Sequence, residues 1–258
     1  MKNFIKNYSG NSLKDVNALV TGSNKGIGLE ITKKLASHGS NIIACCRQKT
    51  DNLIKTFNNL KKKYGVEVEI YEFDLSDQDQ IKNSFEQIKK KFDNIDILVN
   101  NAASIQTSSF LMAPIKSAKK LFEINYFSQI YLTQLVSKMM IRKKKGNIIN
   151  ISSTSGIDVN EGRIFYSATK AALINSSKIL AKELSPFNIR VNVVAPGLIE
   201  TDMMKQNTKS EIIENVLKDL TIKRTGKPEE IANIVYFLAS DLSSYLNGQV
   251  IRVDGGML

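Results

Sequence analysis

A tyrosine and a lysine near the middle of the chain have the types and spacing of a proton-transfer pair. Tyr166 and Lys170 lie four residues apart in RIFYSATKAALI, residues 163–174, a segment rich in helix formers. Residues four apart share one face of a helix, so the two side chains can meet. A free tyrosine has a pKa of about 10, and a nearby cation lowers it by favouring the phenolate. The pair could therefore transfer a proton near neutral pH, although a solvated helix face would show the same spacing.

A glycine-rich segment near the start of the chain has the composition of a phosphate-binding turn. Gly22, Gly26 and Gly28 lie in TGSNKGIG, which continues the apolar run VNALV. Their G-x-x-x-G-x-G spacing differs from the common G-x-G-x-x-G. Glycines nevertheless let the chain turn sharply and let a pyrophosphate approach the backbone, while the following helix supplies N–H donors and positive potential. The segment predicts a dinucleotide site.

The end of the second apolar run selects between the two nicotinamide dinucleotides. An acidic residue there would bind the ribose 2′-hydroxyl of NAD, whereas a cation accepts the 2′-phosphate of NADP. The run ends in CCRQK, so Cys46 occupies the position of the acid and Arg47 follows it, while Lys25 lies inside the glycine turn. Two cations without an acid favour NADP(H) over NAD(H), unless both are merely solvated.

These residues need a scaffold, and the apolar pattern along the chain predicts one. Helical segments are expected at 27–38, 51–63, 77–92, 114–144, 165–184 and 228–240, and apolar runs at 16–22, 41–46, 66–74, 95–101, 147–152, 189–196 and 248–256. Strands that alternate with helices form a parallel sheet covered on both faces. We expect an α/β, Rossmann-like doubly wound fold, with a predominantly seven-stranded parallel sheet in one domain over residues 1–258. Residues 1–11 are expected to form a loose arm, and 197–224 a substrate loop with a short helix at 210–218.

Composition limits the other classes of function. Two adjacent cysteines, Cys45 and Cys46, and a single histidine, His38, argue against metal sites and a Ser-His-Asp triad. No apolar run is long enough for a membrane span, and the polar N-terminus does not read as a signal peptide, so we expect a cytoplasmic protein. The net charge is +11, but the lysine runs fall where helices are expected to end and no nucleic-acid motif accompanies them. We therefore expect no nucleic-acid or membrane partner.

Six segments occur together and in a recognisable order: TGSNKGIG, FDLSD, NNAA, ISSTSG, YSATK and APGLIETDM. This set resembles the classical short-chain dehydrogenase/reductase family, from about residue 12 to 258. Within that family the pattern is most similar to bacterial 3-oxoacyl-acyl-carrier-protein reductases, on NVVAPGLIETDM, KRTGKPEEIANIVYFLASD and NGQVIRVDGG. The resemblance implies reduction of a carbonyl, or oxidation of a secondary alcohol, with NADP(H).

The resemblance also implies roles for individual residues. Tyr166 would be the general acid, Lys170 would lower its pKa and bind the nicotinamide ribose, Ser153 would bind the substrate carbonyl, and Asn125 would hold a water in a proton relay. Asp74 would contact the adenine and Asn101 would lie against the cofactor. Further cofactor contacts would come from Ser23, Ile27, Leu75, Ala102, Pro196, Gly197, Ile199 and Thr201. Relatives are commonly tetramers, so a homotetramer is expected, with a dimer as the alternative.

The chain departs from its nearest pattern around the substrate. Ala103 replaces a glycine, and Phe165 stands where those reductases carry asparagine. Arg163 could contact an anionic substrate, although a surface ion pair with Glu161 is favoured. The basic run at 142–145 could dock an acidic carrier, although a solvated helix end is favoured. The expected substrate is a small or carrier-linked carbonyl, first a 3-oxoacyl thioester. The alternatives are a sugar or other polar hydroxy or keto metabolite, and a non-catalytic dinucleotide-binding regulator.

Overall fold

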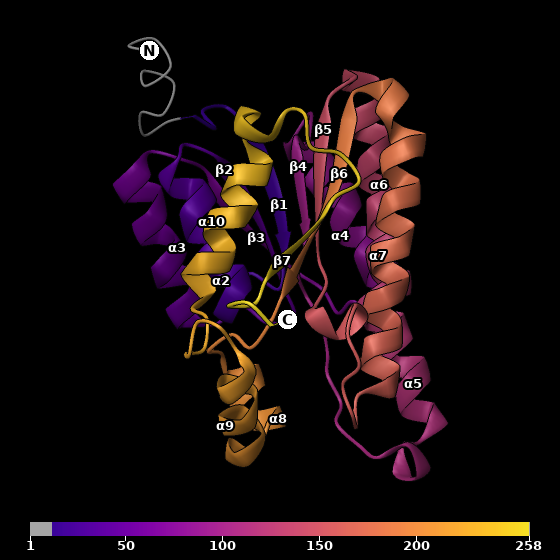
Figure 1. Ribbon diagram of the computed structural model, residues 1–258. Coiled ribbons are helices and arrows are strands. Elements are labelled where there is room, and N and C mark those ends of the chain that lie inside the picture. Colours follow the sequence, from indigo (N-terminus) through magenta and orange to yellow (C-terminus); the bar gives the residue numbers. More distant parts are fainter. Residues whose placement is uncertain (1–11, 258) are drawn as a thin grey trace.

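A single parallel sheet forms the centre of the molecule. The computed structural model describes residues 12–257, and its seven strands follow the order β3-β2-β1-β4-β5-β6-β7 (Figure 1). The strands are β1 (Asn17–Thr21), β2 (Asn41–Cys46), β3 (Val68–Glu72), β4 (Ile97–Asn100), β5 (Gly146–Ile151), β6 (Ile189–Pro196) and β7 (Val250–Val253). All neighbours pair in parallel, which confirms the predicted doubly wound fold. The assignment of residues 1–258 to one domain stays a prediction.

Helices cover both faces of this sheet. They are α2 (Gly26–Ser37), α3 (Asp51–Tyr64), α4 (Gln78–Lys91), α5 (Ile115–Phe122), α6 (Ser128–Lys143), α7 (Ile164–Leu184), α8 (Asp202–Asn207), α9 (Ser210–Asp219) and α10 (Pro228–Ala239). Short 3₁₀ turns occur at Phe110–Met112, Thr154–Gly156, Ser185–Phe187 and Asp241–Ser243. In Figure 1, α2, α3 and α10 lie on one side of the sheet and α4, α6 and α7 on the other.

Successive residues of the central strand enter opposite cores. Ala18 and Val20 of β1 belong to the cluster that contains residues of α2, α3 and α10, whereas Leu19 belongs to the cluster with α4, α6 and α7. Side chains alternate between the two faces of a strand, so a strand that is covered twice must be apolar at every position. This is why the strands read as unbroken apolar runs.

Polar residues define the ends of the flanking helices. The Thr50 side chain caps α3 by accepting from the N–H of Leu53, and Asp77 caps α4 in the same way. The lysine runs at 61–63 and 89–91 occupy the last turns of α3 and α4, where cations interact favourably with the helix dipole. These two lysine runs therefore lie at helix ends, as the sequence predicted.

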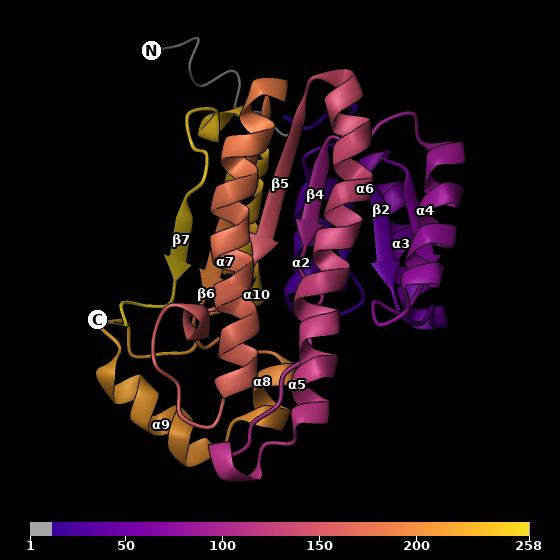
Figure 2. The same ribbon diagram turned by 90° about the vertical axis from the view of Figure 1, so that its right-hand side faces the viewer.

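The segment expected as one long helix at 114–144 is interrupted. A π-helical turn at Glu123–Phe127 separates α5 from α6, and Figure 2 shows the two helices continuing one another beside α7. Turns of this kind are often found at functional sites, and this one contains Asn125.

The region expected as an irregular substrate loop contains two helices. α9 matches the predicted helix at 210–218, whereas α8 was not predicted. Both lie beyond the carboxyl ends of the strands (Figure 1). A parallel bridge between Ile199 and Gly226 joins the two ends of this segment. We call residues 198–226 the lid.

Two expectations concern the ends of the chain and the membrane. The predicted arm at 1–11 lies outside the described residues. Within residues 12–257, no helix is both long and apolar enough to cross a bilayer.

Candidate active site

A cavity opens where the order of the strands reverses. The chain leaves β3 at one edge and returns as β4 on the other side of β1, so the loops after β1 and β4 diverge. Ligands of open parallel sheets bind at such a switch point, beyond the carboxyl ends of the strands. Here the cavity has a volume of about 360 Å³ and is lined by the ends of β1, β2, β4, β5 and β6 together with α7 and the lid.

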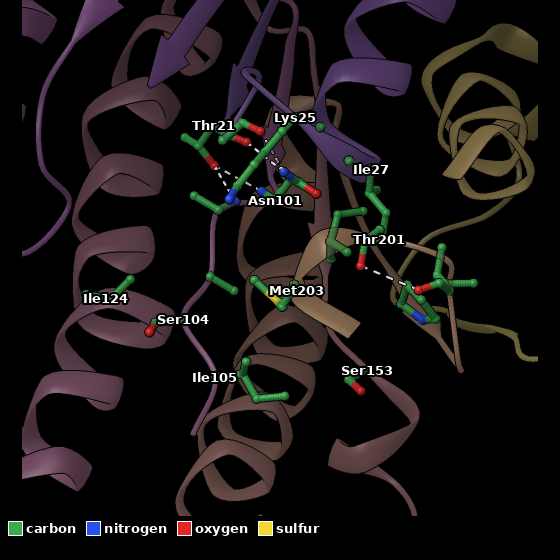
Figure 3. A pocket seen from close by; sticks show the side chains of 18 of the residues that line it. Thr21, Lys25, Ile27, Asn101, Ser104, Ile105, Ile124, Ser153, Thr201 and Met203 are labelled. Carbon is green, nitrogen blue, oxygen red and sulfur yellow. Dashed lines mark hydrogen bonds between the residues drawn. The ribbon is translucent and has the colours of Figure 1, made fainter. Parts of the chain in front are cut away.

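Most of the predicted site residues meet in this cavity. Those that line it are Gly22, Lys25, Gly26, Ile27, Gly28, Arg47, Asp74, Leu75, Asn101, Ala102, Ser153, Tyr166, Lys170, Pro196, Gly197, Ile199 and Thr201. Figure 3 shows Thr21, Lys25 and Asn101 at one end, and Ser104, Ile105, Met203 and Ser153 farther along.

The glycine turn has the shape of an anion cradle. Gly22 and Gly26 have positive φ angles of 66° and 53°, which glycine adopts without strain. A Cβ on Gly28 would collide with the Gly22 carbonyl oxygen and with Nδ2 of Asn101. No side chain caps α2, and its first turn has no acidic residue. The backbone N–H groups and dipole of this helix can therefore face a phosphate, so the residues present fit a dinucleotide pyrophosphate.

Asn101 and Thr21 fasten this turn to the next strand. Asn101 Nδ2 donates to the Thr21 carbonyl oxygen over 2.9 Å, and Thr21 Oγ1 accepts from the N–H groups of Asn101 and Ala102, each over 3.0 Å (Figure 3). The end of β4 and the glycine turn are thereby held as one unit, which keeps the cradle in shape.

Three cations line the cavity on the side of the glycine turn and Asp74. Lys25 and Arg47 line it as predicted, and Lys120 joins them from α5, a contribution that no local sequence pattern indicated. Cys46 presents a thiol where an acid would repel phosphate, and this thiol donates to the carbonyl of Gln48. The positive charge here therefore suits a phosphate group in addition to the pyrophosphate.

Asp74 is the acidic residue that borders these cations. Its carboxylate accepts from the backbone N–H and the hydroxyl of Ser76, each over 2.7 Å. The Ser76 N–H is the main reason why the pKa of Asp74 lies below its usual value, and the charges of Arg47 and Lys120 act in the same direction. Asp74 is therefore an ionised acceptor at neutral pH.

Ser153, Tyr166 and Lys170 meet at the other end of the cavity. Ser153 follows β5, and its Oγ accepts from the N–H of Ser155, which leaves its own O–H free to donate. Tyr166 and Lys170 lie on the first turns of α7, and Lys170 Nζ lies 5.8 Å from the centre of the Tyr166 ring. Lys170 is only 1% exposed, and its ammonium donates to the Ile151 carbonyl oxygen over 2.8 Å. Ser153, Tyr166 and Lys170, which come from two separate sequence motifs, thus line the same end of the cavity, which we call the chamber.

Burial controls the titration of this pair. Burial raises the pKa of Tyr166 above its usual value, although the Ser153 hydroxyl and the charge of Arg163 oppose the rise. Burial also lowers the pKa of Lys170 to about 8. Burial outweighs the neighbouring charges in setting the pKa of the phenol, and the expected lowering of that pKa by Lys170 stays a prediction. A phenol that stays protonated at neutral pH suits proton donation.

Two of the predicted site residues do not line the cavity. Ser23 is buried behind the glycine turn, where its hydroxyl donates to the Cys45 carbonyl oxygen; it supports the turn because its side chain points into the protein. Asn125 is also buried, and its Nδ2 donates to the carbonyl of Ser104 and to Oγ1 of Thr169, while its Oδ1 accepts from the N–H of Ser104. A water relay at Asn125 stays a prediction.

Arg163 occupies a different place from the one favoured by the sequence. It was expected to pair with Glu161 on the surface, but its guanidinium lines the cavity and its Nη2 donates to Thr208 Oγ1 of the lid over 2.8 Å. Glu161 lies in a turn before the helix, whereas Arg163 is the N-cap residue of α7, three residues before Tyr166. That spacing was the signal that could have placed it. Phe165 is not among the lining residues.

Comparisons with known proteins agree with this geometry. Residues 22–258 match the family model described as Enoyl-(Acyl carrier protein) reductase. The 3-oxoacyl-[acyl-carrier-protein] reductase FabG of Aquifex aeolicus is 42% identical over 240 residues, covering 93% of this chain and 96% of the relative. The enzyme of the same name from Thermotoga maritima is 39% identical over 242 residues, covering 93% of this chain and 96% of that relative.

A solved structure extends the likeness to another substrate. L-sorbose reductase from Gluconobacter frateurii, complexed with NADPH and L-sorbose, superposes with a TM-score of 0.88 at 32% identity, covering 95% of this chain and 97% of the other. Since the matches extend over the lid and α7 as well as the cofactor half, they include the residues that would perform the chemistry. The chain belongs to the short-chain dehydrogenase/reductase family of oxidoreductases, whose fold binds a nicotinamide dinucleotide.

Proposed function

We propose that this protein is an NADPH-dependent reductase of 3-oxoacyl thioesters presented on an acyl carrier. The observation that carries the proposal is its likeness to 3-oxoacyl-[acyl-carrier-protein] reductases over 93% of the chain. Ser153, Tyr166 and Lys170, which line one cavity, support it.

The choice of NADP(H) over NAD(H) rests on charge. Lys25, Arg47 and Lys120 line the cavity on the side of the glycine turn, and Cys46 stands where an acid would favour NAD. Gly22, together with Gly26, Gly28 and the uncapped start of α2, would hold the pyrophosphate. Asp74, Leu75, Asn101 and Ala102 would lie along the adenosine, and Ile27, Pro196, Gly197, Ile199 and Thr201 along the nicotinamide side.

The proposed mechanism assigns one task to each catalytic side chain. The nicotinamide, when bound, supplies the hydride. As the carbonyl carbon is reduced, negative charge develops on its oxygen and needs hydrogen-bond donors. The Ser153 hydroxyl donates to this oxygen, and the Tyr166 hydroxyl donates and then transfers its proton. Lys170 stabilises the phenolate that remains, because its buried ammonium lies beside the ring.

A second candidate is reduction of a sugar or another polar ketone. Its support is the likeness to L-sorbose reductase at 32% identity, together with the polar groups of Ser104, Arg163 and Thr208 at the substrate end. A non-catalytic regulator is the weaker alternative, since Ser153, Tyr166 and Lys170 are all present.

Assembly and location complete the proposal. We expect a homotetramer, with α5, α6 and α7 pairing between subunits, and a dimer is the alternative. Phe127, at the end of the π turn before α6, and Ile179 of α7 are about half exposed and would be covered by such pairing. A monomer peak in size-exclusion chromatography would refute this expectation. The cytoplasmic location and the substrate-loop role of 197–224 stay predictions.

The test is the oxidation of reduced cofactor, followed by absorbance. NADPH and NADH are supplied in turn with an acetoacetyl thioester, L-sorbose and other keto sugars. We expect turnover of the thioester with NADPH. Tyr166→Phe should lower kcat about 10²–10⁴-fold while NADPH binding, measured by fluorescence, persists. Turnover of keto sugars alone would make the acyl assignment wrong, and turnover that survives in Tyr166→Phe would refute the assigned acid.

A further inference from the structure

Arg163 is a cation at the catalytic end of the cavity, and no carboxylate between residues 12 and 257 pairs with it. It precedes the first turn of α7 and lines the chamber together with Ser153 and Tyr166. Its Nη2 donates to Thr208 of the lid, and none of the ion pairs found between residues 12 and 257 includes it. Its positive charge is close enough to the Tyr166 phenol to favour the phenolate.

A guanidinium in this position needs an acceptor from the substrate. Arginine carries five N–H donors in a planar fork, and the hydrogen bond to Thr208 satisfies one of them. Donors left unpaired when a ligand excludes water cost free energy. The hydroxyls of Ser153 and Tyr166 are assigned to the reacting carbonyl oxygen, so Arg163 faces a second oxygen atom near that carbonyl.

We propose that Arg163 binds the thioester carbonyl oxygen of a 3-oxoacyl substrate and so selects ketones that carry an acceptor two carbons from the reacting carbon. This inference rests on the proposed function and adds a specificity-determining residue to it. A 3-oxoacyl thioester has its second carbonyl oxygen at this distance along the chain, whereas an isolated ketone does not. Arg163 thereby distinguishes the 3-oxo position from ketones elsewhere on an acyl chain.

The competing explanation is that Arg163 only fastens the lid through Thr208. A fastening role would affect every substrate equally, because the lid lines the cavity whichever substrate is bound. A recognition role would affect only substrates that carry the second oxygen.

The experiment compares two matched substrates with saturating NADPH. One is the acetoacetyl thioester of N-acetylcysteamine, and the other is its S-(3-oxobutyl) thioether, which lacks the thioester oxygen. The readout is the kcat/KM for the thioester divided by the kcat/KM for the thioether. Arg163→Gln should lower this ratio about tenfold to a hundredfold, as expected for a lost charge-assisted hydrogen bond. Thr208→Val, the matched control for lid contact, should leave the ratio at its wild-type value, and Arg163→Lys should restore part of it.

Each other result overturns the inference for a different reason. If Arg163→Gln lowers kcat/KM equally for both substrates, Arg163 only fastens the lid. If acetoacetate, assayed as a third substrate, shows a larger loss than the thioester, Arg163 binds a carboxylate instead. If the wild type reduces neither matched substrate, the proposed function itself is wrong. NADPH binding by fluorescence confirms that each variant is folded, and Arg163→Lys gives a second test should the glutamine variant fail to fold.

Discussion

Replacing the buried lysine with methionine should change how the stability of the protein depends on pH. Lys170 is fully buried, and among residues 12–257 it has no carboxylate partner and one hydrogen bond, to the Ile151 carbonyl oxygen. Methionine has a similar length and no charge. Lys170→Met therefore removes a titrating group from the core while nearly filling its volume.

The magnitude follows from the pKa of Lys170, which burial lowers from 10.5 to about 8. At about 1.4 kcal/mol for each pKa unit, this corresponds to roughly 3 kcal/mol. Because the folded-state pKa lies below the unfolded-state value, the unfolded chain holds more protons between pH 8 and 10.5. The free energy of unfolding of the wild type therefore rises through this window relative to the variant. Near pH 7 the variant gains stability because it no longer buries a charge. This gain is offset because the Ile151 carbonyl loses its hydrogen-bond donor, which costs about 1–3 kcal/mol.

Urea unfolding at several pH values from about 7 to 10 measures this difference. Both proteins should carry Tyr166→Phe, because the nearby phenol also titrates at high pH and would couple to the lysine. The matched control is Lys178→Met, which removes an exposed lysine from the same helix and should shift stability by a constant amount. Parallel curves for the Lys170 pair would refute the reasoning, since they would mean that Lys170 keeps the same pKa in the folded and unfolded states.

Three further predictions concern the cofactor and the thiols. Arg47→Gln should weaken NADPH binding about tenfold or more, as expected for a lost charge-assisted contact, and leave NADH unchanged in fluorescence titrations; an equal loss for both would contradict the assigned role. Gly28→Ala should abolish dinucleotide binding because the added Cβ meets the backbone of the turn, whereas Gly65→Ala, where a Cβ meets nothing within 4 Å, should cost about 1 kcal/mol of stability and preserve binding. Cys45 and Cys46 are 1% and 4% exposed and burial raises their pKa, so Ellman's reagent should label them much faster after unfolding; equally rapid labelling of the native protein would contradict the burial of both thiols.

The scaffold could be predicted because its signals are local. The runs at 41–46 and 189–196 match β2 and β6 at both ends, since Pro196 stops one and polar residues follow the other. The long helix was predicted as one element because its apolar pattern continues across residues 123–127. A π turn adds only one residue to a single turn, and this change is too small to interrupt the apolar pattern of a long helix. The helix at 202–207 is too short to show a period at all.

The site residues also divide into those that local sequence placed and those that it did not. Tyr166 and Lys170 share a face because four residues make about one helical turn, and Gly22, Gly26 and Gly28 were identified by the backbone freedom that the turn needs. These relations lie within one stretch of chain, so the sequence alone determined them, and the family motifs supplied the remaining assignments.

Only the tertiary structure decided which groups face one another across the cavity. Lys120 reaches the cofactor end from a helix distant in sequence, and Arg163 turns toward Thr208, 45 residues later, away from the nearby Glu161. The pKa of Tyr166 rises because the surrounding protein buries the phenol, an effect that depends on every element packed around it. Local spacing fixes which side chains share a face, but burial and long-range contacts exist only once the sheet, helices and lid have assembled.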